Sequence, residues 1–383
     1  MKQITSISVE NQPLFRCLLA IDDPRVPGRC LYPLHEILFI ILCGLIAGCD
    51  TWKSIELFAR ERYRWLKRFT DLTCGVPSHL TLARVFSLLD PHQFETCYRE
   101  WISSQLNFIQ EEFLHIDGKT SRGSSHRASG KKALHLVSAY LPLHGMTLGT
   151  EKTSEKSNEI KAIPALLKTL HIDGRIITID AMGTQKGIAN LIRLKKGHYL
   201  LALKKNHKKF YHKVANAFSR AEELQFKSMV YQQTSTQDYG HHRIEKRRYT
   251  ILPSMYLPQY QQEWKNCQAF IRVESSRYCL AQKKEETSYR YYITSLPFQK
   301  YNKMCEAIRS HWSIENRLHY KLDVGLHEDN VIIHRGYAAE NLAVMRKIVL
   351  TLLQKDKTAN TGILLQRTRA ALNTRYLQKV IGL

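Results

Sequence analysis

The sequence predicts an α/β protein: an all-α N-terminal region, then a mixed β-sheet interrupted by a mostly β insertion. Apolar residues recur at helical spacing as far as about residue 108. From about residue 110, short apolar runs alternate with helical patterns, as in a sheet covered by helices. Short β-like runs then fill residues 205–298. We therefore expect a helical domain at 1–108, an α/β domain at 109–350 and a basic helical tail at 351–383.

The net charge narrows the class of protein. A formal charge of +23 on 383 residues destabilises a compact chain by self-repulsion unless a polyanion neutralises it. Nucleic acid is the first candidate partner, a membrane surface is the second, and a basic but unrelated enzyme is the alternative.

Cysteine usage and the N-terminus bear on location. The nine cysteines are odd in number and form no CxxC pair, which argues against a disulfide framework and a zinc ribbon. The first residues do not read as a signal peptide. A reducing cytoplasm fits these observations.

Four helices are expected in the N-terminal region. The apolar run 37–48 follows Pro33 and is shorter than the about 20 residues of a membrane span, so we expect a buried core helix. Helices at 54–68, 81–89 and 94–109 should follow. The second carries five basic residues on one face, which could dock on a DNA backbone or be a solvated surface.

The α/β region opens with a strand that ends on Asp117. A hairpin (133–149), a helix, a strand ending on Asp180, a helix (185–194) and a further strand (198–203) follow. This order of elements is typical of an RNase H-like sheet, which places acidic residues on neighbouring central strands.

Three carboxylates form the candidate site: Asp117, Asp180, and Glu315 in a helix-like segment. Phosphodiester cleavage is served by two divalent ions ~3.5–4 Å apart, and Mg²⁺ prefers carboxylate oxygens. The sequence therefore predicts a Mg²⁺ site on these three acids, with Mn²⁺ as a substitute.

Each acid also has a purely structural interpretation. Asp117 could be a turn residue before Gly118, Asp180 the N-cap of the next helix, and Glu315 a surface residue paired with a histidine. Rivals of Glu315 for the third ligand position are Asp323, Glu328 and Asp329.

Short motifs along nearly the whole chain resemble the DDE transposases of bacterial insertion sequences, in the branch of the H-repeat-associated proteins. In the N-terminal region they are Asp22-Asp23-Pro24-Arg25, Tyr32-Pro33-Leu34 and Gly75-Val76-Pro77-Ser78 with Thr81 and Arg84. In the α/β region they are Ile116-Asp117-Gly118-Lys119, Lys156-Ser157-Asn158-Glu159-Ile160, Thr178-Ile179-Asp180-Ala181-Met182, Arg243-Ile244-Glu245, His311-Trp312-Ser313-Ile314-Glu315-Asn316, Leu318-His319, Leu322-Asp323-Val324 and Glu328-Asp329.

The resemblance implies a transposase-associated domain at 1–108 and an RNase H-like DDE catalytic domain at 109–350, with Asp117, Asp180 and Glu315 as its acidic triad. It also implies metal-dependent cleavage at terminal inverted repeats, transfer of the freed 3′-hydroxyl to target DNA, and a homodimer or higher oligomer on double-stranded DNA. One departure is His311, which stands where the related signature has Arg.

Five basic residues are candidates for contacts with DNA phosphates: Lys119, Arg122, Arg243, Arg309 and His311. We expect Trp312 to be buried beneath its helix. Two other functions are kept open, namely a non-mobile, repeat-associated DNA-binding remnant and a general DNA nuclease.

Overall fold

The computed structural model describes residues 12–105, 112–125, 130, 132–153, 158–240, 243–279, 284–356 and 361–383. The chain divides into two compact units. The first unit comprises Met1–Gln110, Gly118–Lys156 and Glu315–Leu383, and the second comprises Glu111–Asp117 and Ser157–Ile314. The domain boundary predicted at 108/109 falls outside the described residues.

The N-terminal part of the first unit is helical, as the sequence predicts, and it contains one further helix, α2 (Pro13–Leu19), that was not predicted. The other helices are α3 (Leu34–Ile46), α4 (Trp52–Glu61), α5 (Tyr63–Leu66), α6 (His79–Leu88) and α7 (Pro91–Gln105). The apolar run forms the buried helix α3, in which every residue from Ile37 to Ile46 is buried. No helix in the described part of the chain is both long enough and apolar enough to cross a membrane.

The helix predicted at 54–68 is divided in two at Arg62. Thr51 and Ser54 form a capping box that starts α4. The backbone of Arg62 leaves the helical conformation, and its guanidinium donates to the carbonyl of Ala371 at 2.6 Å. This bond to the C-terminal part of the same unit accompanies the break.

The C-terminal helices pack within the first unit. They are α13 (Ala338–Lys355), α14 (Ile363–Leu372) and α15 (Thr374–Ile381). Arg367 on α14 is 2% exposed and donates to the carbonyls of Leu45 (3.0 Å) and Gly325 (2.7 Å) and to the carboxylate of Asp50 (2.5 Å). The end of the chain thereby supplies hydrogen bonds that complete the N-terminal helices.

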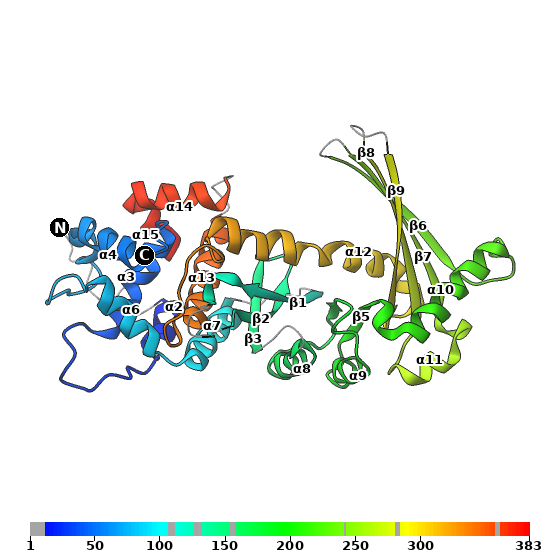
Figure 1. The fold of residues 1–383 in the computed structure, drawn as a ribbon, viewed down its shortest axis with the longest axis horizontal. Coiled ribbons are helices and arrows are strands. Elements are labelled where there is room, and N and C mark those ends of the chain that lie inside the picture. The colour runs from blue at the N-terminus through cyan, green and yellow to red at the C-terminus, as the bar shows by residue number, and fades with distance from the viewer. Residues whose placement is uncertain are drawn as a thin grey trace. The chain divides into compact units, whose positions relative to one another are not determined.

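The sheet contains nine strands in the order β3-β2-β1-β4-β5-β9-β8-β7-β6 (Figure 1). Their bounds are β1 (Phe113–Ser121), β2 (Leu134–Leu141), β3 (Met146–Thr153), β4 (Ile176–Ile179), β5 (His198–Leu203), β6 (Gln232–Gly240), β7 (Arg243–Pro253), β8 (Ala269–Cys279) and β9 (Lys284–Thr294). Strand β1 belongs to both units, since they meet between Asp117 and Gly118. An antiparallel hairpin, β2-β3, precedes parallel pairing of β1, β4 and β5, which confirms the predicted RNase H-like mixed sheet.

The β insertion continues the sheet. β9 pairs antiparallel with β5, and β8, β7 and β6 follow in antiparallel order. These strands have 9 to 11 residues and are longer than the runs expected from the sequence. Their outer halves are mostly polar and are exposed or half-buried, so side-chain hydrophobicity alone does not reveal them. Helices α10 (Lys208–Glu223) and α11 (Pro258–Glu263) accompany the insertion.

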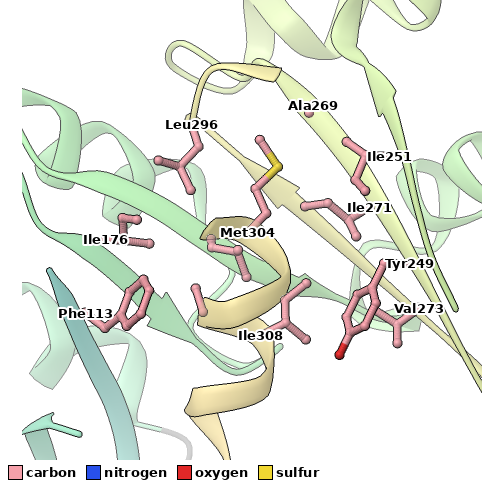
Figure 2. Packing of buried hydrophobic residues seen from close by; sticks show 12 residues of the cluster. Phe113, Ile176, Tyr249, Ile251, Ala269, Ile271, Val273, Leu296, Met304 and Ile308 are labelled. Carbon is pink, nitrogen blue, oxygen red and sulfur yellow. The ribbon is translucent and has the colours of Figure 1, made fainter. Parts of the chain in front are cut away.

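Helix α12 (Tyr301–His311) is anchored in the core of the second unit. Its residues Met304, Ala307 and Ile308 are at most 6% exposed and belong to a cluster with Phe113, Ile176 and apolar residues of β5, β7 and β8. Figure 2 shows Met304 and Ile308 pointing into this cluster. Burial of this face fixes the helix against the strands that carry the aspartates.

Candidate active site

Two of the predicted acids lie at equivalent positions of neighbouring parallel strands of the second unit, Asp117 within β1 and Asp180 directly after β4. The register of β1 and β4 pairs Ile116 with Ile179, so that Asp117 and Asp180 occupy the next step along. Both are half-buried. Two carboxylates at one edge of parallel strands match the oxygen donors that Mg²⁺ prefers.

Strand β1 does not end at Asp117, as the sequence suggested, but continues to Ser121. Its second half stays in the sheet beside β2, and Thr120 there contacts the ring of His135 at 2.7 Å. Asp117 is therefore a strand residue and not a turn residue.

The carboxylate of Asp180 is held by the turn that follows β4. Its Oδ1 accepts hydrogen bonds from the backbone N–H groups of Met182 (3.0 Å) and Gly183 (3.3 Å). The next helix, α9 (Lys186–Leu194), has Gln185 at its N-cap, so Asp180 does not cap it. The two hydrogen bonds therefore orient one carboxylate oxygen of Asp180, and they do not serve to cap a helix.

Glu315 is exposed and belongs to the first unit, where it is the second residue of a π-helical segment, Ile314–His319. Regular α-helix ends at His311, four residues before Glu315. π-Helical turns occur frequently at functional sites. Among the described residues, no three His, Cys, Asp or Glu side chains are grouped as a metal site, so the three-acid ligand set stays a prediction.

The three rivals of Glu315 gather around Lys119 in the first unit. The ammonium of Lys119 lies 2.7 Å from Asp323, 2.6 Å from Glu328 and 3.5 Å from Asp329. Burial acts to lower the pKa of Lys119, but Glu328 and Asp323 outweigh it and hold the pKa above its ordinary value. These acids therefore serve as partners of a buried cation in this structure.

The other predicted DNA contacts differ in exposure. Arg122 is 84% exposed, and Arg309 is exposed but forms an ion pair with Asp238 at 2.7 Å. Arg243 is half-buried at the start of β7. His311 faces inward, where its Nδ1 contacts the hydroxyl of Thr178 at 2.7 Å, and burial lowers its pKa to about 4 although Asp180 acts in the opposite direction.

Trp312 is 42% exposed, so the prediction that it is buried is wrong. The guanidinium of Arg290 on β9 lies 5.2 Å from the centre of its ring. The guanidinium therefore covers one face of the indole, where a buried tryptophan would have packed against apolar side chains.

A basic, tyrosine-lined groove in the second unit was missed at the sequence level. It has a volume of ≈ 440 Å³ and is lined by Ala202, Leu203, Lys204, Lys205, Tyr211, Tyr289, Arg290, Tyr291 and Tyr292. The groove begins at the carboxyl end of β5, which is parallel to β4 and next to it. Only the basic run 204–209 signalled it in the sequence; the strand register brings the tyrosines there.

An RNase H-like mixed sheet with two aspartates on adjacent parallel strands is the catalytic scaffold of the DDE class of DNA-recombining proteins. Two family models agree. The "Transposase DDE domain" model matches residues 106–352, and the "DDE_Tnp_1-associated" model matches residues 15–102. The chain belongs to the DDE transposase family, as the motifs predicted.

Relatives match over nearly their full length. "Putative transposase YncI" of Escherichia coli O157:H7 is 39% identical over 379 residues, covering 97% of this chain and 95% of that protein. "H repeat-associated putative transposase YhhI" of Escherichia coli (strain K12) is 34% identical over 378 residues, covering 98% and 99%. A piggyBac transposase synaptic complex with hairpin DNA has a TM-score of 0.46 at 11% identity over 99% of this chain and 79% of that chain, a likeness too weak to define fold or function.

Proposed function

We propose that this protein is the transposase of an insertion sequence, which binds the terminal inverted repeats, cleaves DNA at the element ends and joins the freed 3′-hydroxyl to target DNA. The observation that carries the proposal is the placement of Asp117 and Asp180 at adjacent positions of parallel strands inside the matched DDE domain. We assign the third acid to Glu315 from its motif.

The donor chemistry fits divalent metal. Asp117 and Asp180 offer carboxylate oxygens, and two N–H groups already orient Asp180. Bound Mg²⁺ or Mn²⁺ would supply activation of a water or sugar hydroxyl and stabilisation of the leaving oxygen. The protein's own part is to hold these carboxylates in place and to position the phosphodiester.

Basic and aromatic side chains support the DNA part of the proposal. Lys204, Lys205 and Arg290 line the groove together with tyrosines, a combination suited to phosphates and bases. The exposed side chains of Arg122 and Arg309 add positive charge. Because a reaction on two ends needs both at once, we expect a homodimer or higher oligomer on DNA.

The test uses purified protein, a labelled duplex carrying the element's own end, and Mg²⁺ or Mn²⁺. Asp117→Asn, Asp180→Asn and Glu315→Gln should each lower end cleavage by about a thousandfold, since metal-ion catalysis supplies several kcal/mol and each 1.36 kcal/mol is tenfold in rate. The exposed Asp173 and Glu306 provide controls for the same chemical changes. Asp173→Asn and Glu306→Gln should cut like wild type.

Each other outcome points elsewhere. Tight end binding without cutting by any variant would indicate the DNA-binding remnant, and cutting without preference for end sequence would indicate a general nuclease. Cutting retained by Glu315→Gln alone would remove Glu315 from the triad and direct attention to Asp323, Glu328 and Asp329.

A further inference from the structure

A buried polar chain lies directly behind the two aspartates. His115 stands two residues before Asp117 on β1, and Thr178 stands two residues before Asp180 on β4. The hydroxyl oxygen of Thr178 lies 2.6 Å from Nδ1 of His115 and 2.7 Å from Nδ1 of His311, the last residue of α12. One hydroxyl therefore joins both aspartate-bearing strands and the end of a helix.

The hydrogen bonds of this network are buried. His115 is 0% exposed and Thr178 is 2% exposed, so water does not replace the hydrogen bonds. The ring of Phe113 stacks on that of His115 with centroids 6.4 Å apart, and the ring of His311 meets His115 edge-on at 5.5 Å.

The geometry makes the link directional. One hydroxyl contacts the Nδ1 atoms of two imidazole rings that meet edge-on, so each hydrogen bond constrains the rotation of one ring. Burial lowers the pKa of both rings, that of His115 well below its ordinary value and that of His311 to about 4.

The hydrogen count predicts the tautomers. A threonine hydroxyl has one hydrogen to donate, and the described residues give Thr178 Oγ1 only these two ring partners. Because a buried hydroxyl hydrogen needs an acceptor, we expect Thr178 to donate to one Nδ1 and to accept from the N–H of the other. The two histidines should then hold opposite tautomers.

We propose that His115, Thr178 and His311 form a positioning network that fixes the spacing of β1, β4 and the end of α12 and thereby orients the carboxylates of Asp117 and Asp180 for divalent metal. This inference rests on the proposed function. An apolar core could fill the same space, but it would not set the rotation of the strands and helix through directed hydrogen bonds. Replacing a residue that hydrogen-bonds directly to a metal ligand typically changes metal affinity 10- to 100-fold, and this network acts one step further from the ligands, so we expect an effect at the lower end of that range.

The experiment compares Thr178→Val, which keeps the shape and loses the hydroxyl, with Thr178→Ser, which keeps the hydroxyl. Mn²⁺ affinity is measured by electron paramagnetic resonance without DNA, together with end cleavage. Thr178→Val should bind Mn²⁺ about tenfold more weakly, and Thr178→Ser should recover wild-type affinity. Thr250→Val is the matched control, because Thr250 is also buried (1% exposed) but lies on β7.

A second measurement does not depend on activity. Long-range ¹H–¹⁵N spectra of protein with ¹⁵N-labelled histidine should show one ring of the pair protonated at Nδ1 and the other at Nε2. Thr178→Val should abolish this pattern and Thr178→Ser should keep it. Should Thr178→Val fail to fold, His311→Phe keeps a ring, removes Nδ1 and is expected to weaken Mn²⁺ binding in the same way.

The outcomes separate the two proposals. Equal Mn²⁺ affinity in Thr178→Val, Thr250→Val and wild type would overturn the positioning role while leaving the transposase proposal standing. Nε2–H tautomers on both rings in the wild-type spectra would leave the hydroxyl with only one of its two hydrogen bonds and would also overturn the network. Wild-type protein that shows opposite tautomers but neither binds Mn²⁺ nor cuts end DNA would overturn the proposed function and, with it, the positioning role.

Discussion

The ammonium group of Lys119 lies 2.6 Å from the carboxylate of Glu328, a residue 3% exposed and 209 positions further along the chain. Asp323 and Asp329 form ion pairs with the same ammonium group. Burial acts against the ionised form of Glu328, but Lys119 and Arg346 outweigh it and keep its pKa below the ordinary value. This pairing ties the end of β1 to the segment that follows the π-helical turns, within the first unit.

Replacing Lys119 should therefore destabilise the protein. Lys119→Met leaves the buried carboxylate of Glu328 without its main cation, and breaking a buried pair costs about 3–5 kcal/mol. Lys186→Met is the matched control, since its pair with Glu263 is exposed on both sides (56% and 46%) and is worth less than about 1 kcal/mol. Urea unfolding measures both.

The same variant tests the predicted phosphate contact of Lys119. If the lysine binds DNA, the slope of log affinity against log salt should fall by about one in folded Lys119→Met protein. An unchanged slope with lowered stability would assign Lys119 to the acid cluster alone.

Gly183 should be sensitive to a single methyl group. A Cβ there would come within 2.7 Å of Ile163 and still closer to Ile179, so the turn has to move. The N–H of Gly183 would then shift away from Asp180. We expect Gly183→Ala to cost about 1–3 kcal/mol of stability and to lower end cleavage.

Gly187, four residues later on α9, is the control for that change. A Cβ at Gly187 meets nothing within 4 Å, so Gly187→Ala should leave cleavage intact and add about 0.5–1 kcal/mol of stability through helix propensity. Equal cleavage by both variants would show that the turn tolerates displacement.

Glu56 should make the first unit sensitive to acid. Its carboxylate accepts from Arg60 (2.7 Å) on α4 and from the backbone N–H of His79 (2.7 Å), where α6 begins. Arg60, then His79, lower the pKa of Glu56 to about 2. Because the folded-state pKa lies below the ordinary 4.5, this stabilisation is present above about pH 4.5 and disappears as the pH falls toward 2.

The measurement is the difference in unfolding free energy between wild type and Glu56→Gln at a series of pH values. We expect about 1 kcal/mol near pH 7, since a pair close to the surface is screened by solvent, and a decline below pH 4.5. A difference that does not change with pH would exclude the ionised carboxylate as its source.

Local patterns predicted much of this fold. The apolar run at α3, the apolar lead-ins to Asp117 and Asp180, and the order of strands and helices all follow from hydrophobic periodicity. Those signals placed the two aspartates on neighbouring strands because parallel strands in this order bring their carboxyl ends together.

Longer-range features had no such signal. The outer halves of β6–β9 are polar on both faces, so pairing and not hydrophobicity defines their length. From the sequence, Lys119 is predicted to contact DNA phosphate, but the fold places Glu328 beside it. His311 is likewise predicted to contact phosphate, but its ring contacts the buried hydroxyl of Thr178. The Trp312 prediction failed because Arg290, from a distant strand, covers one face of the indole.

The bond between Arg367 and Asp50 has a consequence for how the protein is made. These residues are 317 positions apart, and the arginine also donates to the carbonyl of Leu45 near the end of α3. At translation rates of about 5–20 residues per second, roughly 15 to 60 s separate the synthesis of the two partners. During that interval all residues of the second unit are synthesised, whereas the N-terminal helices still lack the hydrogen bonds that Arg367 supplies. A chain that ended before α14 would contain every strand of the sheet but would lack the arginine that completes the hydrogen bonding of the N-terminal helices.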